Sequence, residues 1–99
     1  MFKIAQNAET VTKESLREYR FSAEDVLPTL ADRQVRRYSA ERATTLGNGY
    51  QGKVDIYFRT ADGATKRVQT TVWATDAEFL TLKAGASLPL RSVLGFDFY

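Results

Sequence analysis

Four cations between residues 33 and 53 have types and spacing that could bind phosphate groups. They are Arg33, Arg36, Arg37 and Lys53. The three arginines are three and four residues apart, so a helix would place them on one face that could contact a nucleic acid backbone. Their acidic neighbours Asp32 and Glu41 favour the other interpretation, a solvated helix face of mixed charge. Binding of phosphates by these residues is therefore kept as the alternative.

Residues that commonly carry catalysis are missing or scattered. The chain has no cysteine and no histidine, which excludes thiol chemistry, histidine-based triads and the zinc sites built on these ligands. Carboxylates alone could still bind Mg²⁺ or Ca²⁺, but no loop of the EF-hand type is present. The aspartates that an acid–base pair would need are spread over expected turns and outer strand faces, at Asp55, Asp62, Asp76 and Asp97. We therefore expect a protein that is not an enzyme and uses no cofactor.

Length and composition indicate one globular domain spanning residues 1–99. A chain of 99 residues that is 43% hydrophobic and 26% charged can form one core and leaves little room for a second. Its 14 Lys and Arg residues nearly balance its 12 Asp and Glu residues. The small net charge therefore does not require a nucleic acid or an anionic membrane as partner. No apolar run reaches the roughly 18 residues of a membrane span. Because residues 1–15 also lack a signal-peptide core, we expect a cytoplasmic protein with no membrane partner.

The first half of the chain has apolar residues at helical spacing, and its clearest predicted helix spans residues 29–47. Thr29 can cap the start of this helix by accepting a hydrogen bond from an early backbone N–H. Gly47 suits the left-handed position that often follows a helix end. The segment 1–28 is expected to form only short helical turns. The helix is amphipathic, and its apolar stripe comprises Leu30, Ala31, Gln34, Val35, Tyr38 and Leu46.

The second half alternates between apolar and polar residues, which predicts a five-stranded meander over residues 50–99. Turn signals such as Asp62-Gly63 separate the strands, and connections this short favour antiparallel pairing. Five short strands bury one face economically as a small barrel, with the preceding helix over its open end. An open sheet packed against the helix is the alternative, and both arrangements are α+β. The expected strands are residues 53–59, 67–75, 78–83, 87–90 and 94–98.

The order of one helix and five short antiparallel strands resembles the small barrels of the SH3-like and Sm-like families. The tight link over residues 85–93 is similar to the ending of those barrels. A second resemblance rests on four pieces of sequence: LGN at 46–48, GKVDIYF at 52–58, DG at 62–63 and VQTTVWA at 68–74. This pattern is similar to that of small uncharacterised proteins of Bacteroidetes-type bacteria. It implies a bacterial protein with such a barrel, and it carries no established activity.

Strand alternation places four aromatic residues on the side opposite the expected core. They are Tyr57, Trp73, Phe79 and Tyr99. The N-terminal segment could cover these rings, forming a second small core with Leu16, Tyr19, Phe21, Val26 or Leu27. The rings could instead contact a second copy of the chain or another protein, or they could stack on the bases of a single-stranded nucleic acid.

These observations favour a small bacterial interaction module that acts by protein contact or self-association. The partner is then a second copy or another protein, and the four aromatic residues are the candidate interface. The alternative is a Sm-like module that binds single-stranded RNA or DNA through Arg33, Arg36, Arg37 and Lys53.

Overall fold

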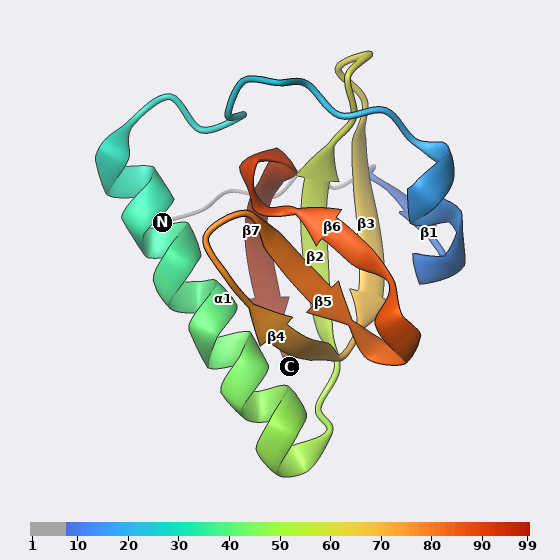
Figure 1. Ribbon diagram of the computed structural model, residues 1–99, viewed down its shortest axis with the longest axis vertical. Coiled ribbons are helices and arrows are strands. Elements are labelled where there is room, and N and C mark those ends of the chain that lie inside the picture. The colour runs from blue at the N-terminus through green and yellow to red at the C-terminus, as the bar shows by residue number, and fades with distance from the viewer. Residues whose placement is uncertain (1–7) are drawn as a thin grey trace.

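The computed structural model describes residues 8–99, which form one α-helix, three short 3-10 helices and seven strands (Figure 1). In chain order these elements are β1 (Glu9–Val11), η1 (Lys13–Glu18), α1 (Leu30–Tyr50), β2 (Val54–Arg59), β3 (Thr65–Thr70), β4 (Val72–Thr75), β5 (Phe79–Leu82), η2 (Lys83–Gly85), β6 (Ser87–Pro89), η3 (Leu90–Ser92) and β7 (Val93–Phe98). The result is a small, β-rich α+β domain.

The strands form two sheets, and one lies in front of the other in Figure 1. The larger sheet has the order β1-β3-β2-β7, in which β2 is antiparallel to both neighbours and β1 is parallel to β3. The smaller sheet is the antiparallel meander β4-β5-β6. Only Thr71 separates β3 from β4, so the chain passes from one sheet to the other at a single residue. The core includes Val54, Ile56, Phe58 and Val68 from the larger sheet and Leu80, Leu82 and Leu88 from the smaller one.

Helical segments cover two opposite sides of the pair of sheets, and each contacts one strand of either sheet. On one side α1 packs against β4 and β7, which are edge strands of different sheets. On the other side η1 packs against β3 and β6. Buried Leu16 of η1 belongs to the core, and the rings of Tyr19 and Phe21 lie 6.3 and 6.1 Å from the ring of Phe58. Three of the N-terminal apolar residues therefore complete the main core instead of forming a second one.

The predicted closed barrel is wrong, because the strands form separate four- and three-stranded sheets. The expected strand 67–75 is broken at Thr71, which gives β3 and β4 to different sheets. α1 packs against β4 and β7, and η1 packs against β3 and β6, at the seams that strand pairing would close in a barrel. The helix is also not the first element, because β1 and η1 precede it, and β1 adds a parallel pairing that the predicted meander lacked.

The helix α1 begins as predicted but buries a different face. Thr29 caps its start, since the Thr29 hydroxyl accepts a hydrogen bond from the Asp32 N–H at 3.1 Å. It continues beyond Gly47 to Tyr50, and Gln51 takes the left-handed conformation with φ of 51°. The expected apolar stripe is mostly exposed, although Leu46 is half-buried against the core. The buried residues of α1 are Arg36, Ala40, Ala43 and Gly47.

Close packing explains this choice of face. A Cβ added to Gly47 would lie 2.1 Å from the backbone oxygen of Val72, so the helix approaches β4 directly through its small residues. Ala40, Ala43 and Gly47 are spaced by three and four residues and allow this approach. The larger side chains of the apolar stripe would hold α1 farther from β4.

Candidate functional site

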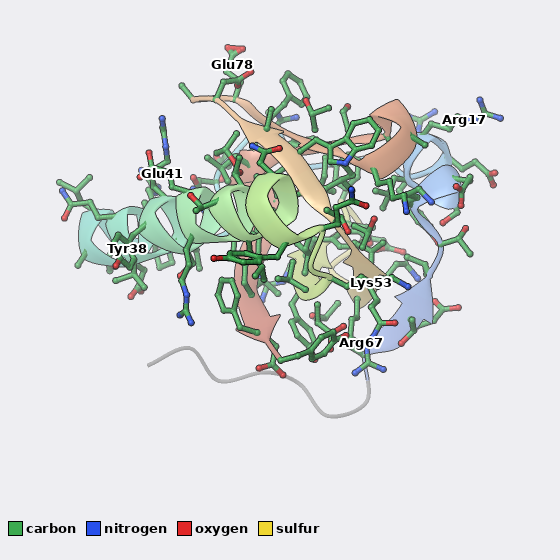
Figure 2. The ribbon with its side chains drawn as sticks, turned by 90° about the horizontal axis from the view of Figure 1, so that it is seen from below. Arg17, Tyr38, Glu41, Lys53, Arg67 and Glu78 are labelled. Atoms are coloured by element: carbon green, nitrogen blue, oxygen red, sulfur yellow. The ribbon has the colours of Figure 1, made fainter. Side chains whose placement is uncertain are left out.

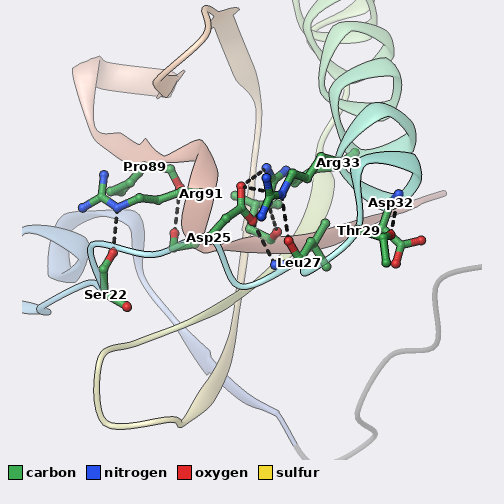
Figure 3. A network of polar contacts seen from close by, with 11 residues as sticks. Ser22, Asp25, Leu27, Thr29, Asp32, Arg33, Pro89 and Arg91 are labelled. Carbon is green, nitrogen blue, oxygen red and sulfur yellow. Dashed lines mark hydrogen bonds and ion pairs between the residues drawn. The ribbon is translucent and has the colours of Figure 1, made fainter.

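The three arginines expected on one face of the helix have separate roles. Arg36 is only 6% exposed, and its Nη1 and Nη2 donate to the two carboxylate oxygens of Asp25 at 2.8 and 2.7 Å. Arg33 donates from Nε to the Leu27 carbonyl at 2.8 Å (Figure 3). Arg37 forms an exposed ion pair with Glu41, one helical turn later, at 3.3 Å. Lys53 is exposed on the connection between α1 and β2. The structure therefore offers no exposed face containing all three arginines.

The contacts of Arg36 fasten the segment before α1 to the start of β7, an edge strand of the larger sheet. Besides Asp25, Arg36 donates to the Val93 carbonyl at 3.1 Å. Nearby, the Val26 N–H donates to the Arg91 carbonyl at 2.9 Å and Arg91 Nε donates to the Ser22 carbonyl at 2.6 Å (Figure 3). Burial by itself raises the pKa of Asp25, but hydrogen bonds from Arg36 and the Leu27 N–H outweigh it and lower that pKa. These contacts therefore tie the segment before α1 to η3 and to the start of β7.

The four aromatic candidates do not form one surface. Tyr57 is only 3% exposed, and Arg67 donates to its hydroxyl at 3.4 Å. Tyr99 is exposed, and its hydroxyl donates to Asp55 at 2.6 Å. Burial and this hydrogen bond raise the pKa of Tyr99. Its hydroxyl also accepts a hydrogen bond from Gln69.

Trp73 and Phe79 lie on the smaller sheet and line different hollows. Trp73 sits at an irregularity in the pairing of β4 with β5, where the register shifts between Val72 and Ala74. It lines a hollow of about 400 Å³ together with Lys83. Phe79 lines a larger hollow of about 610 Å³ between η1 and the β5–β6 region. Trp73 and Phe79 are both partly exposed, so they can contact a partner, whereas buried Tyr57 is not accessible.

Side chains for acid–base or metal chemistry are not assembled in the described residues. Asp55 and Asp97 are opposite each other in the pairing of β2 with β7, but Asp55 accepts hydrogen bonds from Tyr99 and Gln69. Within residues 8–99, no three acidic, cysteine or histidine residues are grouped where they could hold a metal ion.

The most unusual surface is the outward face of α1, which the sequence patterning assigned to the apolar side of the helix. Leu30, Val35 and Tyr38 are 68%, 61% and 71% exposed, and Ala31 beside them is also exposed. We call these four residues the outer α1 stripe. Tyr38 and buried Gly47 are nine residues apart, which corresponds to two and a half helical turns, so they point in opposite directions. Figure 2 shows Tyr38 and Glu41 projecting from the helix toward solvent.

A second pattern on the same helix, made of small residues, could have identified this stripe as exposed. Ala40, Ala43 and Gly47 mark the face that approaches a strand closely, and hydrophobicity alone gives them little weight. Because α1 packs on the strands with one face only, the face opposite these small residues has to point outward.

Comparison with known proteins adds no assignment. No family model matches the chain, and neither a curated protein nor a solved structure is significantly similar to it. The resemblance to small Bacteroidetes-type proteins therefore stays a prediction. In the part of the chain that the structure describes, no helix combines the length and the apolar character needed to cross a membrane.

Proposed function

We propose that this protein is a non-enzymatic interaction module that self-associates through the outer α1 stripe. One observation carries this proposal: three large apolar side chains are 61–71% exposed along a helix whose opposite face buries an ion-paired arginine. Single exposed apolar residues are common on protein surfaces, but Ala31, Val35 and Tyr38 are spaced by four and three residues and so adjoin on one helix face, as residues of an interaction site do. The nucleic acid alternative has less support, because Arg36 is buried and Arg33 and Arg37 have partners within the chain.

A second copy of the chain is a suitable partner because the stripe can pair with itself. Two α1 helices that run antiparallel around a twofold axis can place Val35 of each copy against Tyr38 of the other. The same register sets Ala31 of one copy opposite Arg42 of the other. Arg42 lies over the ring of Phe98, with its guanidinium carbon 4.2 Å from the ring centre.

The small size of the stripe sets the expected strength. A stable interface buries about 800 Å² on each partner, and four residues on one helix supply less than that. We therefore expect a weak dimer, with a dissociation constant in the range of about 10 µM to 1 mM.

Sedimentation velocity over about 10 µM to 1 mM protein tests the proposal. The natural chain should shift from monomer toward dimer across this range, and Tyr38→Glu should remain monomeric because it places a charge at the centre of the apolar contact. Tyr50→Glu is the matched control, since Tyr50 is an exposed tyrosine of the same helix outside the stripe. Circular dichroism should show both variants folded, because both tyrosines are exposed.

Two results would overturn this proposal. The first is a natural chain that stays monomeric at the highest concentration. The second is a loss of dimer in Tyr50→Glu equal to that in Tyr38→Glu, which would place the contact elsewhere on the molecule.

A further inference from the structure

A second surface lies on the opposite side of the domain from α1. It is the groove of about 610 Å³ between η1 on one side and β5, η2 and β6 on the other. Its lining contains aromatic and other apolar side chains, namely Leu16, Tyr19, Phe21, Phe79 and Pro89. Leu16 is buried and Tyr19 and Phe21 pack on Phe58, so this part of the groove is anchored in the core.

The charged residues that line the groove are mainly cationic. Lys13, Arg17 and Lys83 contribute three positive charges, and Glu14 contributes the one negative charge. The charge of Glu14 is already paired with Lys13, because their side chains form an ion pair at 3.0 Å. Arg17 points outward from η1 in Figure 2. An apolar surface with a net positive rim is complementary to a ligand with an apolar side chain between acidic groups.

The strand at this groove limits how a ligand can bind. The Ala86 carbonyl accepts a hydrogen bond from the Leu82 N–H of β5 at 2.6 Å, and the Leu90 N–H donates to the carbonyl of Glu78, the residue before β5, at 2.8 Å. The backbone of Ser87 therefore points away from β5. Pro89 has no N–H, and its carbonyl accepts a hydrogen bond from the Ser92 hydroxyl at 2.7 Å. Because so little of the β6 edge is free, adding a strand to it is unfavourable, and recognition has to come from side chains.

We propose that this groove binds an extended acidic peptide segment with one large apolar side chain. The apolar side chain lies against Phe79 and Tyr19, and the flanking carboxylates lie near Arg17 and Lys83. This site is independent of the outer α1 stripe, because α1 packs on β4 and β7 whereas η1 packs on β3 and β6. The same chain can therefore bind such a peptide as a monomer or as a dimer.

Fluorescence anisotropy with a labelled synthetic peptide tests this site. The probe is a peptide of Asp and Glu residues around one central Leu, and the reference peptides replace either the Leu by Ala or the acids by Lys. The first peptide should bind more tightly than both references, and its affinity should fall as salt is added. Phe79→Ala and Lys83→Glu should each weaken binding about tenfold or more, as expected for residues central to a contact.

Two control variants and a nucleic acid probe make the outcome decisive. Lys53→Glu reverses an exposed cation outside the groove and should leave binding unchanged, and so should Tyr38→Glu, which disrupts only the proposed dimer. Absence of binding, or an equal loss in Lys53→Glu and Lys83→Glu, would overturn the proposal. Tighter binding of a single-stranded oligothymidylate that is lost in Phe79→Ala would also overturn it and would assign the groove to nucleic acid instead.

Discussion

Arg36 is a charged side chain inside the packed part of a small domain, and its surroundings explain how the chain tolerates it. Both carboxylate oxygens of Asp25 and the Val93 carbonyl accept its Nη hydrogens. Its Nε has no hydrogen-bond partner among residues 8–99. Such a pair adds little stability compared with apolar residues of the same shape, but loss of one member leaves the other charge buried and uncompensated.

Removal of Asp25 should therefore be costly. Asp25→Ala is expected to lower the free energy of unfolding by about 3–5 kcal/mol, because it leaves the buried guanidinium without its counter-ion. Urea unfolding measures this change. Arg37→Ala breaks an exposed pair of the same helix and should change stability by less than about 0.5 kcal/mol. The double variant Asp25→Leu with Arg36→Leu should recover much of the loss, and a double variant as unstable as Asp25→Ala would contradict the explanation.

The helix α1 combines a local start signal with a face chosen by its neighbours. The Thr29 cap acts within the first turn, whereas the buried face is set by contact with β4 at Gly47. Gly49 lies two residues later in the same helix, and a Cβ added there meets nothing within 4 Å. These two glycines separate the effect of packing from the effect of helix propensity.

Alanine at the two glycines should change stability in opposite directions. Gly47→Ala is expected to lower the free energy of unfolding by about 1–3 kcal/mol or more, because its Cβ would collide with the Val72 backbone. Gly49→Ala should raise it by up to about 1 kcal/mol, because alanine favours the helix and has space there. Thermal unfolding of both variants checks this prediction, and a stabilised Gly47→Ala would show that α1 does not pack so closely on β4.

At the scale of the whole molecule, carboxylates in three different connections favour the folded state when they are ionised. Asp25 precedes α1, Asp62 lies in the β2–β3 turn and Asp76 lies in the β4–β5 turn. Hydrogen bonds from the Thr60 hydroxyl and the Ala64 N–H lower the pKa of Asp62. The backbone N–H groups of Glu78 and Phe79 lower the pKa of Asp76. The pKa of Asp25 is also lowered.

These lowered pKa values predict loss of stability in acid. A carboxylate with a folded-state pKa below its unfolded value of about 3.9 stabilises the fold fully above that value. This contribution is lost as pH falls through the folded-state pKa, so the urea midpoint should fall between about pH 5 and pH 2. The combined variant Asp25→Asn, Asp62→Asn and Asp76→Asn should show a smaller fall than the natural chain. Asp97→Asn, which alters an exposed carboxylate on β7, serves as the control and should retain the natural fall.

The sequence by itself determined the features that depend on neighbouring residues. The Thr29 cap and the Asp62-Gly63 turn are both present, with Gly63 at a φ of 88° that glycine adopts easily. Such signals act within a few residues and can be recognised from local sequence. The division into a helical and a β-rich part follows from the same kind of signal.

Only the tertiary structure decided which helix face is buried and how the sheets close. Arg36 becomes a core residue because Asp25 and Val93, 11 and 57 residues away, meet it in space. The barrel does not close because α1 and η1 occupy the seams where its remaining strand pairs would form. The apolar stripe expected from the sequence contained Tyr38 and not Ala40, but steric fit against β4 admits the small side chain and leaves the large one in solvent. That fit depends on the shape of a surface assembled from distant parts of the chain.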